Sequence, residues 1–344
     1  MKKIILLHLF LSAGNLLFAQ TGYFICENFN ALPFHSFPIL KTTENHIAVF
    51  KINTLIQLTE LNKIIDTTDK VIFDKLFNTN DSVSYGKTSI DYNILCNTST
   101  IFSVAVSSEW CGASCGHWTN YYNFNSANGD LISLYDLLDK NKISAAANYL
   151  QMKRTAHFIS QLKNIESNEP VDTLSILEEI NNSHLGYFYF RNDSFFIDDE
   201  ECLSKLEKYL DLNMTTAFSY SELQLYLNKY GTALFKENKK GIDKFRGEHF
   251  PQLYIGTTSD ARTFYFSYKF YYDTNGEGFI AFTTDGIARL LNGTLENNHF
   301  ILTENDSDFN DTGFIKADLF KGIITGFYTS ADGRTNYTFS AKKM

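Results

Sequence analysis

The feature that most restricts the fold is a series of short alternating segments in the C-terminal part of the chain. From residue 250 onward, apolar and polar side chains alternate between turn residues such as Asn275-Gly276, Asp285-Gly286 and Asp332-Gly333. Asn-Gly and Asp-Gly favour two-residue hairpin turns, because both central residues of such a turn need a positive φ. The pattern predicts an all-β antiparallel meander or small barrel over residues 250–344. We expect its strands at 263–272, 278–283, 287–293, 299–304, 313–317, 322–328 and 336–341.

The preceding part of the chain mixes helical and strand patterns. Apolar residues at helical spacing follow Thr54, which we take as an N-cap, and they predict a helix within residues 45–80. Alternation at 90–94 and 102–106 predicts a hairpin, and an aromatic strand follows at 118–125. This mixture predicts an α+β fold in which helices pack on an antiparallel sheet. Further segments are helices at 71–77, 143–162 and 172–182, a hairpin at 186–198, and a helix from Ser221 to Tyr230 that is capped by Ser219 or Ser221 and ends at Gly231.

Residues 1–19 have the pattern of a signal peptide. Lys2 and Lys3 precede an apolar stretch, Ile4 to Phe18, and Ala19 is a plausible cleavage position. The stretch contains polar residues and is shorter than the roughly 20 apolar residues that span a bilayer, so a membrane anchor is disfavoured. We therefore expect a secreted or periplasmic protein with no transmembrane segment after signal cleavage.

A charged stretch that is poor in apolar residues separates the two patterns, and we interpret it as a linker. The length that remains after the signal peptide suits about two domains. The predicted organisation is a signal peptide at 1–19, an α+β domain at 20–235, a linker at 236–249 and a β-meander or barrel domain at 250–344.

The charge of the chain excludes some partners. The formal net charge is −9, and it becomes more negative when Lys2 and Lys3 are removed. An acidic surface repels phosphate, so nucleic acid is not expected as a partner and docking on anionic lipid is disfavoured. No motif indicates a cofactor, and none is expected.

Five cysteines remain after signal cleavage, in a compartment where disulfides persist. Cys111 and Cys115 are close enough in sequence to close a small ring. Cys26 could join either Cys96 or Cys202, and the sequence does not choose between them. Because five is an odd number, at least one thiol is left over or pairs between chains.

One segment of the α+β part resembles a known family. Residues 102–138 read FSVAVSSEWCGASCGHWTNYYNFNSANGDLISLYDLL, which is a strand, a Gly-Ala loop, an aromatic strand and a Leu-rich helix start. With the hairpin and helix at 186–231, this resembles the secreted domain of unknown function that forms the ectodomain of a lysozyme-sensing anti-sigma factor and precedes some polysaccharide deacetylase domains. The resemblance covers roughly residues 85–235. It implies an α+β fold and contact with cell-wall glycan or with a glycan-acting protein.

The C-terminal part resembles a small β module of secreted Bacteroidetes proteins, to which no activity is assigned. The matching residues are Leu291 to Gly293, Leu302 to Glu304, Thr312-Gly313 and Gly322 to Phe327.

Candidate chemistry is sparse. Cys111, Cys115 and His117 could begin a zinc site, but no fourth ligand is evident and a disulfide is the favoured interpretation, so no metal is expected. The acidic run from Asp306 to Gly313 departs from a calcium loop at two required positions and is interpreted as a turn. No Gly-x-Ser-x-Gly motif is present, and the adjacent carboxylates at 178–179 and 198–201 do not converge on one substrate. No catalytic residue is therefore assigned.

The favoured function is binding without catalysis. Trp110 and Trp118 flank the Gly-containing loop, and we predict a contact surface at residues 110–118 formed by Trp110, Gly112, His117 and Trp118. The partner would be a glycan or a secreted protein. The alternatives are a hydrolase that acts on cell-wall polymers and a small-ligand cup inside the C-terminal β part.

Overall fold

The computed structural model describes residues 23–32, 35–42, 45–65, 86–112, 114–163, 171–182, 187–191, 194–205, 207–210, 212–236, 251–272, 274–305 and 310–344. The predicted signal peptide, the helix expected at 71–77, the linker apart from Lys236 and the first half of the acidic turn, residues 306–309, lie outside these residues. Within them, no helix combines the length and apolarity that crossing a membrane requires.

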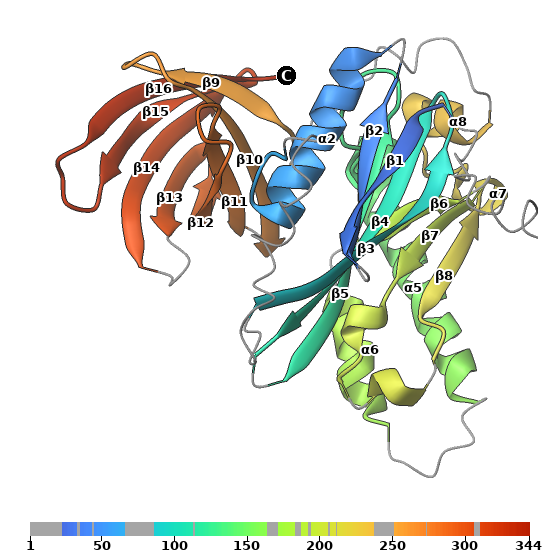
Figure 1. Ribbon diagram of the computed structural model, residues 1–344. Coiled ribbons are helices and arrows are strands. Elements are labelled where there is room, and N and C mark those ends of the chain that lie inside the picture. Colours follow the sequence, from blue (N-terminus) through green and yellow to red (C-terminus); the bar gives the residue numbers. More distant parts are fainter. Residues whose placement is uncertain are drawn as a thin grey trace, which may run out of the picture.

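A five-stranded sheet with the order β1-β2-β3-β4-β5 forms the centre of the N-terminal part (Figure 1). Neighbouring strands are antiparallel except β2 and β3, which pair in parallel where His35 lies opposite Ile90. A parallel pair needs a long crossover connection, and helix α2 lies in the connection between these two strands. The strands are β1 (Ile25–Leu32), β2 (His35–Lys41), β3 (Gly86–Asn97), β4 (Ile101–Cys111) and β5 (Cys115–Asn125).

Helix α2 (His46–Leu61) covers one face of this sheet and lies between the sheet and the C-terminal strands (Figure 1). It begins after Asn45, whose side chain accepts a hydrogen bond from the Ala48 amide at 3.3 Å. The N-cap predicted at Thr54 is therefore wrong, since Thr54 lies buried in the middle of the helix. Asn45 fits the cap position better because its side-chain amide also donates to the Ala127 carbonyl at 2.6 Å, which fixes the helix start to the turn after β5.

A three-stranded sheet with the order β6-β7-β8 packs on the opposite face of β4 and β5. The side-chain amide of Asn123 donates to the Phe188 carbonyl at 2.7 Å, and the Phe190 amide donates to the Ser103 hydroxyl at 3.3 Å. The hairpin predicted at 186–198 is confirmed as β6 and β7. The elements of this layer are β6 (Phe188–Arg191), β7 (Ser194–Asp198), β8 (Thr215–Ser219), α4 (Leu134–Leu137), α5 (Ile143–Leu162), α6 (Thr173–Asn182), α7 (Tyr220–Leu223), α8 (Lys229–Lys236), η1 (Lys140–Lys142), η2 (Glu200–Cys202) and η3 (Glu207–Leu210).

The helix predicted from Ser221 to Tyr230 is replaced by two short helices, α7 and α8. Ser219 caps α7 through a capping box with Glu222, as one of the two alternatives expected. Gly231 does not end a helix but lies inside α8. A Cβ atom at Gly231 would lie 2.4 Å from the Leu137 carbonyl oxygen, so this glycine is needed for close packing of α8 against α4.

The C-terminal strands form a closed antiparallel barrel in which every strand pairs with its sequence neighbour and β16 pairs with β9 (Figure 1). This confirms the predicted all-β barrel. Gly286 and Gly333 have positive φ in their turns, as expected for Asp-Gly pairs. Asn275-Gly276 instead starts β11, and there a Cβ at Gly276 would lie 2.1 Å from the Lys269 carbonyl oxygen on β10. The strands are β9 (Tyr254–Thr258), β10 (Thr263–Tyr272), β11 (Asn275–Phe282), β12 (Ala288–Glu296), β13 (His299–Asn305), β14 (Asp311–Phe320), β15 (Ile323–Ser330) and β16 (Asn336–Lys343).

The interior of the barrel holds a hydrophobic core of buried side chains. Phe264, Phe300 and Tyr268 are fully buried there, and rings from different strands meet edge to face. Small barrels of eight strands are filled by side chains in this way. The arrangement favours a packed core over the alternative of a small-ligand cup.

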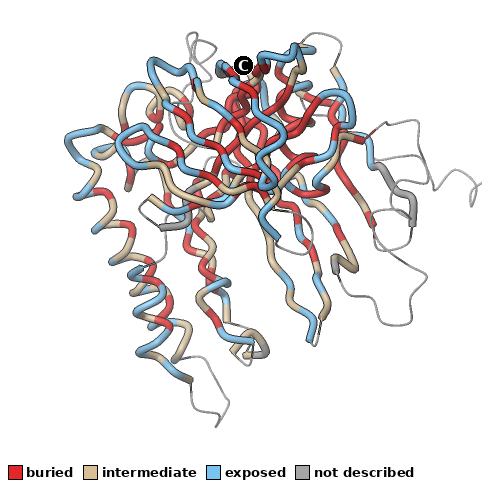
Figure 2. The backbone as a smooth tube through the Cα atoms, turned by 90° about the vertical axis from the view of Figure 1, so that its left-hand side faces the viewer, coloured by how far each residue is buried: buried red, intermediate tan, exposed pale blue. Residues whose placement is uncertain are grey.

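The barrel and the N-terminal part share one hydrophobic core. Side chains of α2 pack with Leu253, which precedes β9, and with Tyr265 and Phe279, which point out of the barrel toward the helix. The backbone continues the contact, because the Ile64 amide donates to the Gly286 carbonyl at 2.8 Å. Figure 2 shows the buried segments concentrated in the body of the molecule, whereas the projecting helix and hairpins carry exposed residues.

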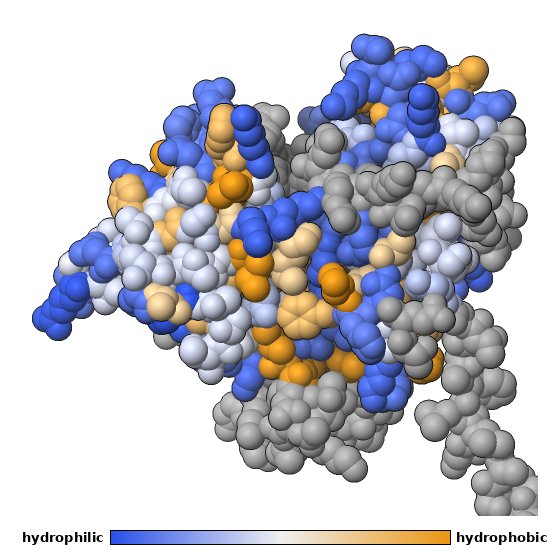
Figure 3. Space-filling view, turned by 90° about the horizontal axis from the view of Figure 1, so that it is seen from above, coloured by the Kyte–Doolittle hydropathy of each residue, from blue (hydrophilic) through white to orange (hydrophobic). Residues whose placement is uncertain are grey.

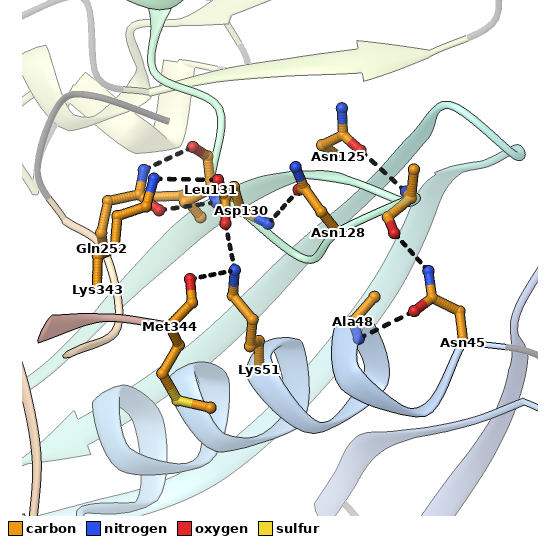
Figure 4. Close-up of polar contacts among 11 residues, drawn as sticks. Asn45, Ala48, Lys51, Asn125, Asn128, Asp130, Leu131, Gln252, Lys343 and Met344 are labelled. Carbon is orange, nitrogen blue, oxygen red and sulfur yellow. Dashed lines mark hydrogen bonds and ion pairs between the residues drawn. The ribbon is translucent and has the colours of Figure 1, made fainter. Parts of the chain in front are cut away.

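A buried polar cluster also crosses this junction (Figure 4). Asp130 forms ion pairs with Lys51 of α2 and with Lys343 of β16. The Lys51 ammonium also donates to the Met344 carbonyl at 3.0 Å. Gln252, just before β9, donates to the Leu131 carbonyl at 2.8 Å and accepts from its amide at 3.3 Å. Polar groups of both parts are thus satisfied by each other at the junction.

The surface seen in Figure 3 is mixed, and its apolar residues form small groups among hydrophilic ones. Scattered single apolar residues are normal on a protein surface and need no partner to explain them. Exposure alone therefore does not identify a contact site on this protein.

Candidate functional site

The predicted contact residues lie at the end of the β4–β5 hairpin, at residues 109–118, which we call the hairpin tip. In the strand register Cys111 lies opposite Cys115, and Glu109 lies opposite His117. Cys111 and Cys115 form a disulfide, as expected. The bond ties the two strand ends together across the connecting loop.

Trp110 and Trp118 lie on the same face of the hairpin. Trp110 pairs with Gly116 and Trp118 pairs with Ser108, so the two tryptophans are diagonal neighbours about 7–8 Å apart, a distance that aromatic side chains can span. The side chain of Trp110 is 47% exposed and that of Trp118 is partly buried. Gly116 leaves open space beside Trp110, since a Cβ there would meet nothing within 4 Å. The result is an aromatic surface that is accessible from one side.

Lys87 of β3 borders this aromatic surface. It lies opposite Trp110 in the sheet, and its ammonium group is 5.8 Å from the centre of the Trp118 ring. The ammonium donates to the Glu60 carbonyl at 2.6 Å, which links the tip to the end of α2. Burial lowers the pKa of Lys87, and the nearby Glu60 carboxylate opposes this shift. Lys87 thus provides a positively charged hydrogen-bond donor next to the two indoles.

Glu60 is a buried carboxylate that organises the base of this surface. It accepts hydrogen bonds from the Asn120 side-chain amide at 2.9 Å and from the Tyr122 hydroxyl at 2.5 Å. Burial, and then the Glu60 charge, raise the pKa of Tyr122 well above its usual value. These contacts hold β5 against the end of α2.

We expect alkaline pH to destabilise the protein, with Tyr122 as one of the groups responsible. The folded state has the higher pKa, so the stability contributed by the neutral phenol is fully present below the pKa of an unfolded tyrosine, about 10, and is lost as pH rises above it. The expected slope is about 1.4 kcal/mol per pH unit for this one group. Urea unfolding at several pH values measures it. Tyr122→Phe should weaken the dependence above pH 10, and an unchanged slope in this variant would contradict the assignment.

The opposite face of the hairpin tip carries a different set of groups. Nε2 of His117 lies 3.1 Å from a Glu109 carboxylate oxygen, and the His117 side chain is 74% exposed. The Thr88 hydroxyl donates to Glu109 at 2.8 Å and lies 3.6 Å from the Cys111 sulfur. Oxygen atoms of Glu109 and the sulfurs of Cys111 and Cys115 all lie within 4.8 Å of one another. His117 is therefore near the predicted surface but faces away from the tryptophans.

The loop of the tip is anchored to a neighbouring segment. The Lys205 ammonium donates to the Ser114 hydroxyl at 2.8 Å and to the Cys115 carbonyl at 2.7 Å. The Gly112 amide donates to the Ser114 carbonyl at 3.3 Å, so its backbone closes the turn. A direct binding role for Gly112 remains a prediction.

The other disulfide candidates, Cys26, Cys96 and Cys202, form no disulfide. Each packs against a different hydrophobic cluster: Cys26 against the core shared with the barrel, Cys96 against the core beneath β6–β8, and Cys202 against the core around α6. The pairings considered for Cys26 are therefore wrong. Burial raises the pKa of the Cys26 thiol to about 11, which keeps it protonated.

Most of the other candidate aromatics serve as core. Tyr122 is buried under α2, and Phe264, Phe266 and Tyr268 fill the barrel. Tyr121 stacks on Tyr189 at 4.9 Å between ring centres. Among the described aromatic candidates of residues 110–122, only Trp110 and Trp118 lie together at the tip.

The sequence interpretation missed Lys87, Glu60 and Glu109. Lys87 and Glu60 come from β3 and α2, and no local pattern connects them to the loop. Glu109 could have been found, because it lies two positions from Cys111 and residues i and i+2 of a strand share a face. Thr88 could not have been found, because its contact with Glu109 depends on the bulge between Lys87 and Ser89.

No family model and no curated protein matches this chain. Among solved structures, a DUF3298 family protein from Pseudomonas aeruginosa PAO1 is 10% identical over 43% of this chain and 63% of its own, with a TM-score of 0.33. A member of the same family from Bacteroides fragilis is 13% identical over 64% of this chain and 99% of its own, with a TM-score of 0.43. A redesigned β-barrel is 12% identical over 27% of this chain and 88% of its own, with a TM-score of 0.21. Two of these three similar structures are DUF3298 family proteins.

Proposed function

We propose that this protein is a secreted or periplasmic, non-catalytic binding module whose hairpin tip contacts cell-wall glycan. The observation on which the proposal rests is that Trp110 and Trp118 lie diagonally on one face of the tip, beside the ammonium group of Lys87. The aromatic rings offer flat apolar faces to the C–H groups of sugar rings, and the ammonium offers a donor to their oxygens.

The surface is held in place before any ligand binds. The Cys111–Cys115 disulfide joins the strand ends, the Lys205 ammonium fixes the loop, and Glu60 fixes Lys87. Groups that are already ordered lose less conformational entropy on binding, which favours affinity. Such ordering suits recognition of an extended, rigid polymer.

The sequence resemblance supports the same class of ligand. The segment from Phe102 to Leu138 resembles secreted domains that sense lysozyme or precede polysaccharide deacetylases, and both contexts involve cell-wall glycan. The apolar stretch at residues 4–18 supports export to the compartment that contains this polymer. A glycan-acting protein is the other partner that the resemblance suggests, and the experiment below separates the two.

Replacement of the tryptophans should abolish most of the binding. We expect Trp110→Ala and Trp118→Ala each to weaken binding of residues 20–344 to purified peptidoglycan by about tenfold to thirtyfold, in line with about 2 kcal/mol for an aromatic hot spot. Co-sedimentation with peptidoglycan measures the affinity. Phe314→Ala is the matched control, because this exposed aromatic lies on the outer face of the barrel, 43% exposed, and its loss should change nothing.

Equal binding by the wild type and both tryptophan variants would contradict the proposed surface. Binding to a glycan-acting protein such as lysozyme, with no binding to the polymer, would assign the tip to the protein partner instead. Immobilised lysozyme is the probe for this arm.

The hydrolase alternative has one favourable observation, the contact between His117 and Glu109. A carboxylate can orient an imidazole that acts as a base. Release of soluble sugar fragments from peptidoglycan by the wild type, and its loss in His117→Ala, would support this alternative over binding alone.

A further inference from the structure

We propose that the second face of the hairpin tip is a zinc site that is gated by the redox state of Cys111 and Cys115. In the oxidised protein the two sulfurs are joined to each other. After reduction, the two thiolates, the His117 imidazole and the Glu109 carboxylate would bind one Zn²⁺ ion. This site lies on the face of the hairpin tip opposite the tryptophans, and the inference does not rest on the proposed glycan ligand.

The strand register supplies the four ligands. Cys111 and Cys115 form one cross-strand pair, and Glu109 and His117 form another, two positions further from the loop. Residues i and i+2 of a strand share a face, so all four side chains leave the hairpin on the same side. Trp110, Gly116 and Trp118 point to the other side. Two cross-strand pairs on one face of the hairpin thus present two sulfurs, one nitrogen and one carboxylate.

Glu109 lies close to each of the other three ligand residues. Atoms of Glu109, Cys111 and Cys115 lie within 4.8 Å of one another, and Nε2 of His117 lies 3.1 Å from Glu109. Zinc bonds of about 2.0–2.3 Å in a tetrahedron place two ligand atoms about 3.3–3.8 Å apart. The His117 side chain, which is 74% exposed, would rotate toward the sulfurs to complete the site. Separation of the two sulfurs requires only that the disulfide be broken.

The groups around the tip suit both the reduction of the disulfide and the binding of zinc. Cys115 is exposed, so a reductant can reach the disulfide. The Thr88 hydroxyl donates to Glu109 and lies beside the Cys111 sulfur, as a supporting residue of a metal site does. Lys205 holds an ammonium group against the Cys115 carbonyl, where its charge favours a thiolate.

The redox step balances with a dithiol as reductant. The dithiol gives two electrons and two protons to the Cys111–Cys115 bond, becoming a disulfide itself, and two thiols form. Zinc then displaces the two thiol protons and undergoes no change of oxidation state. The oxidised protein would bind no zinc at this site, so the metal content of the tip would report the redox state of its surroundings.

Zinc content measured in two redox states tests this proposal directly. Residues 20–344 are incubated with one equivalent of Zn²⁺, with or without a phosphine reductant, and dialysed before metal analysis by mass spectrometry. We expect about one bound zinc per chain after reduction and none without it. Co²⁺ in place of Zn²⁺ should give thiolate charge-transfer absorption in the reduced protein alone.

Variants assign the ligands. His117→Ala and Glu109→Gln should each weaken zinc binding to the reduced protein by at least about tenfold. Cys202→Ser removes a thiol outside the tip and should leave binding unchanged. Equal zinc binding by the reduced wild type and Cys111→Ser/Cys115→Ser would overturn the proposal, as would equal binding by oxidised and reduced wild type. Circular dichroism verifies that each variant is folded, and no glycan enters these measurements.

Discussion

Asp130→Ala is expected to lower the free energy of unfolding by about 3–5 kcal/mol, because it leaves two lysine ammonium groups at a buried site without their carboxylate. Asp130 is fully buried, and the side chains of Lys51 and Lys343 that contact it are 4% and 19% exposed. Removing one member of a buried ionic cluster costs more than the cluster itself contributes, since the remaining charges are poorly solvated. Urea unfolding followed by circular dichroism measures the effect.

The position of Asp130 gives this variant a further consequence. Lys51 belongs to α2 and Lys343 to β16, so the cluster joins the barrel to the N-terminal part (Figure 4). We therefore expect Asp130→Ala to expose the junction to proteolysis as well. Glu27→Ala is the matched control: its ion pair with Lys41 is about half exposed and should contribute no more than about 1 kcal/mol. Equal stability of the Asp130 and Glu27 variants would contradict the structure of the junction.

Phe264→Ala should destabilise the protein by about 3–5 kcal/mol, through the cavity it leaves in the barrel. Phe264 is fully buried and meets Phe339 edge to face at 5.6 Å between ring centres. Its ring also lies over Gly256 of β9, where a Cβ would come within 2.4 Å of the ring. The void would therefore remove packing between three strands. Thermal unfolding and urea unfolding both measure the loss.

The same experiment distinguishes a packed barrel from a ligand cup. Phe327→Ala is the control, because this ring lies on the outside of the barrel with 48% of its surface exposed and should cost less than about 1 kcal/mol. If Phe264→Ala lowers the free energy of unfolding no more than the control does, this side chain does not pack the interior of the barrel. That result would restore the small-ligand cup as an alternative.

The barrel was predictable because its signals are local. Alternation sets which side chains face the interior, and Asp285-Gly286 and Asp332-Gly333 mark turns whose positive φ is intrinsic to the residue pair. Asn275-Gly276 shows the limit of such signals. Its glycine is required because the Lys269 backbone of the neighbouring strand β10 lies so close, and only the paired structure reveals this contact.

The ends of the helices were less predictable, because tertiary contacts decide them. Thr54 follows the usual capping pattern, but Asn45 begins α2 because its side chain also binds the turn after β5. Glycine commonly ends a helix, but Gly231 lies inside α8, where the Leu137 carbonyl leaves no room for a Cβ atom. In both cases a residue distant in sequence overrides a local preference.

The candidate site was predictable in part. The disulfide between Cys111 and Cys115 follows from spacing within one loop, and so does the placement of the tryptophans beside it. The separation of His117 from the tryptophans follows from the strand register, which assigns them to opposite faces. Lys87 reaches the site from another strand, and no spacing in the sequence predicts its place above Trp118.

Backbone hydrogen exchange of residues 20–344, measured with and without soluble peptidoglycan fragments, tests the proposed glycan-binding surface most directly. We expect slower exchange at residues 86–88 and 107–119 on addition of the fragments, with the outer face of the barrel at 313–327 unchanged. Protection that is confined to the barrel, with the hairpin tip exchanging at the same rate in both samples, would contradict it.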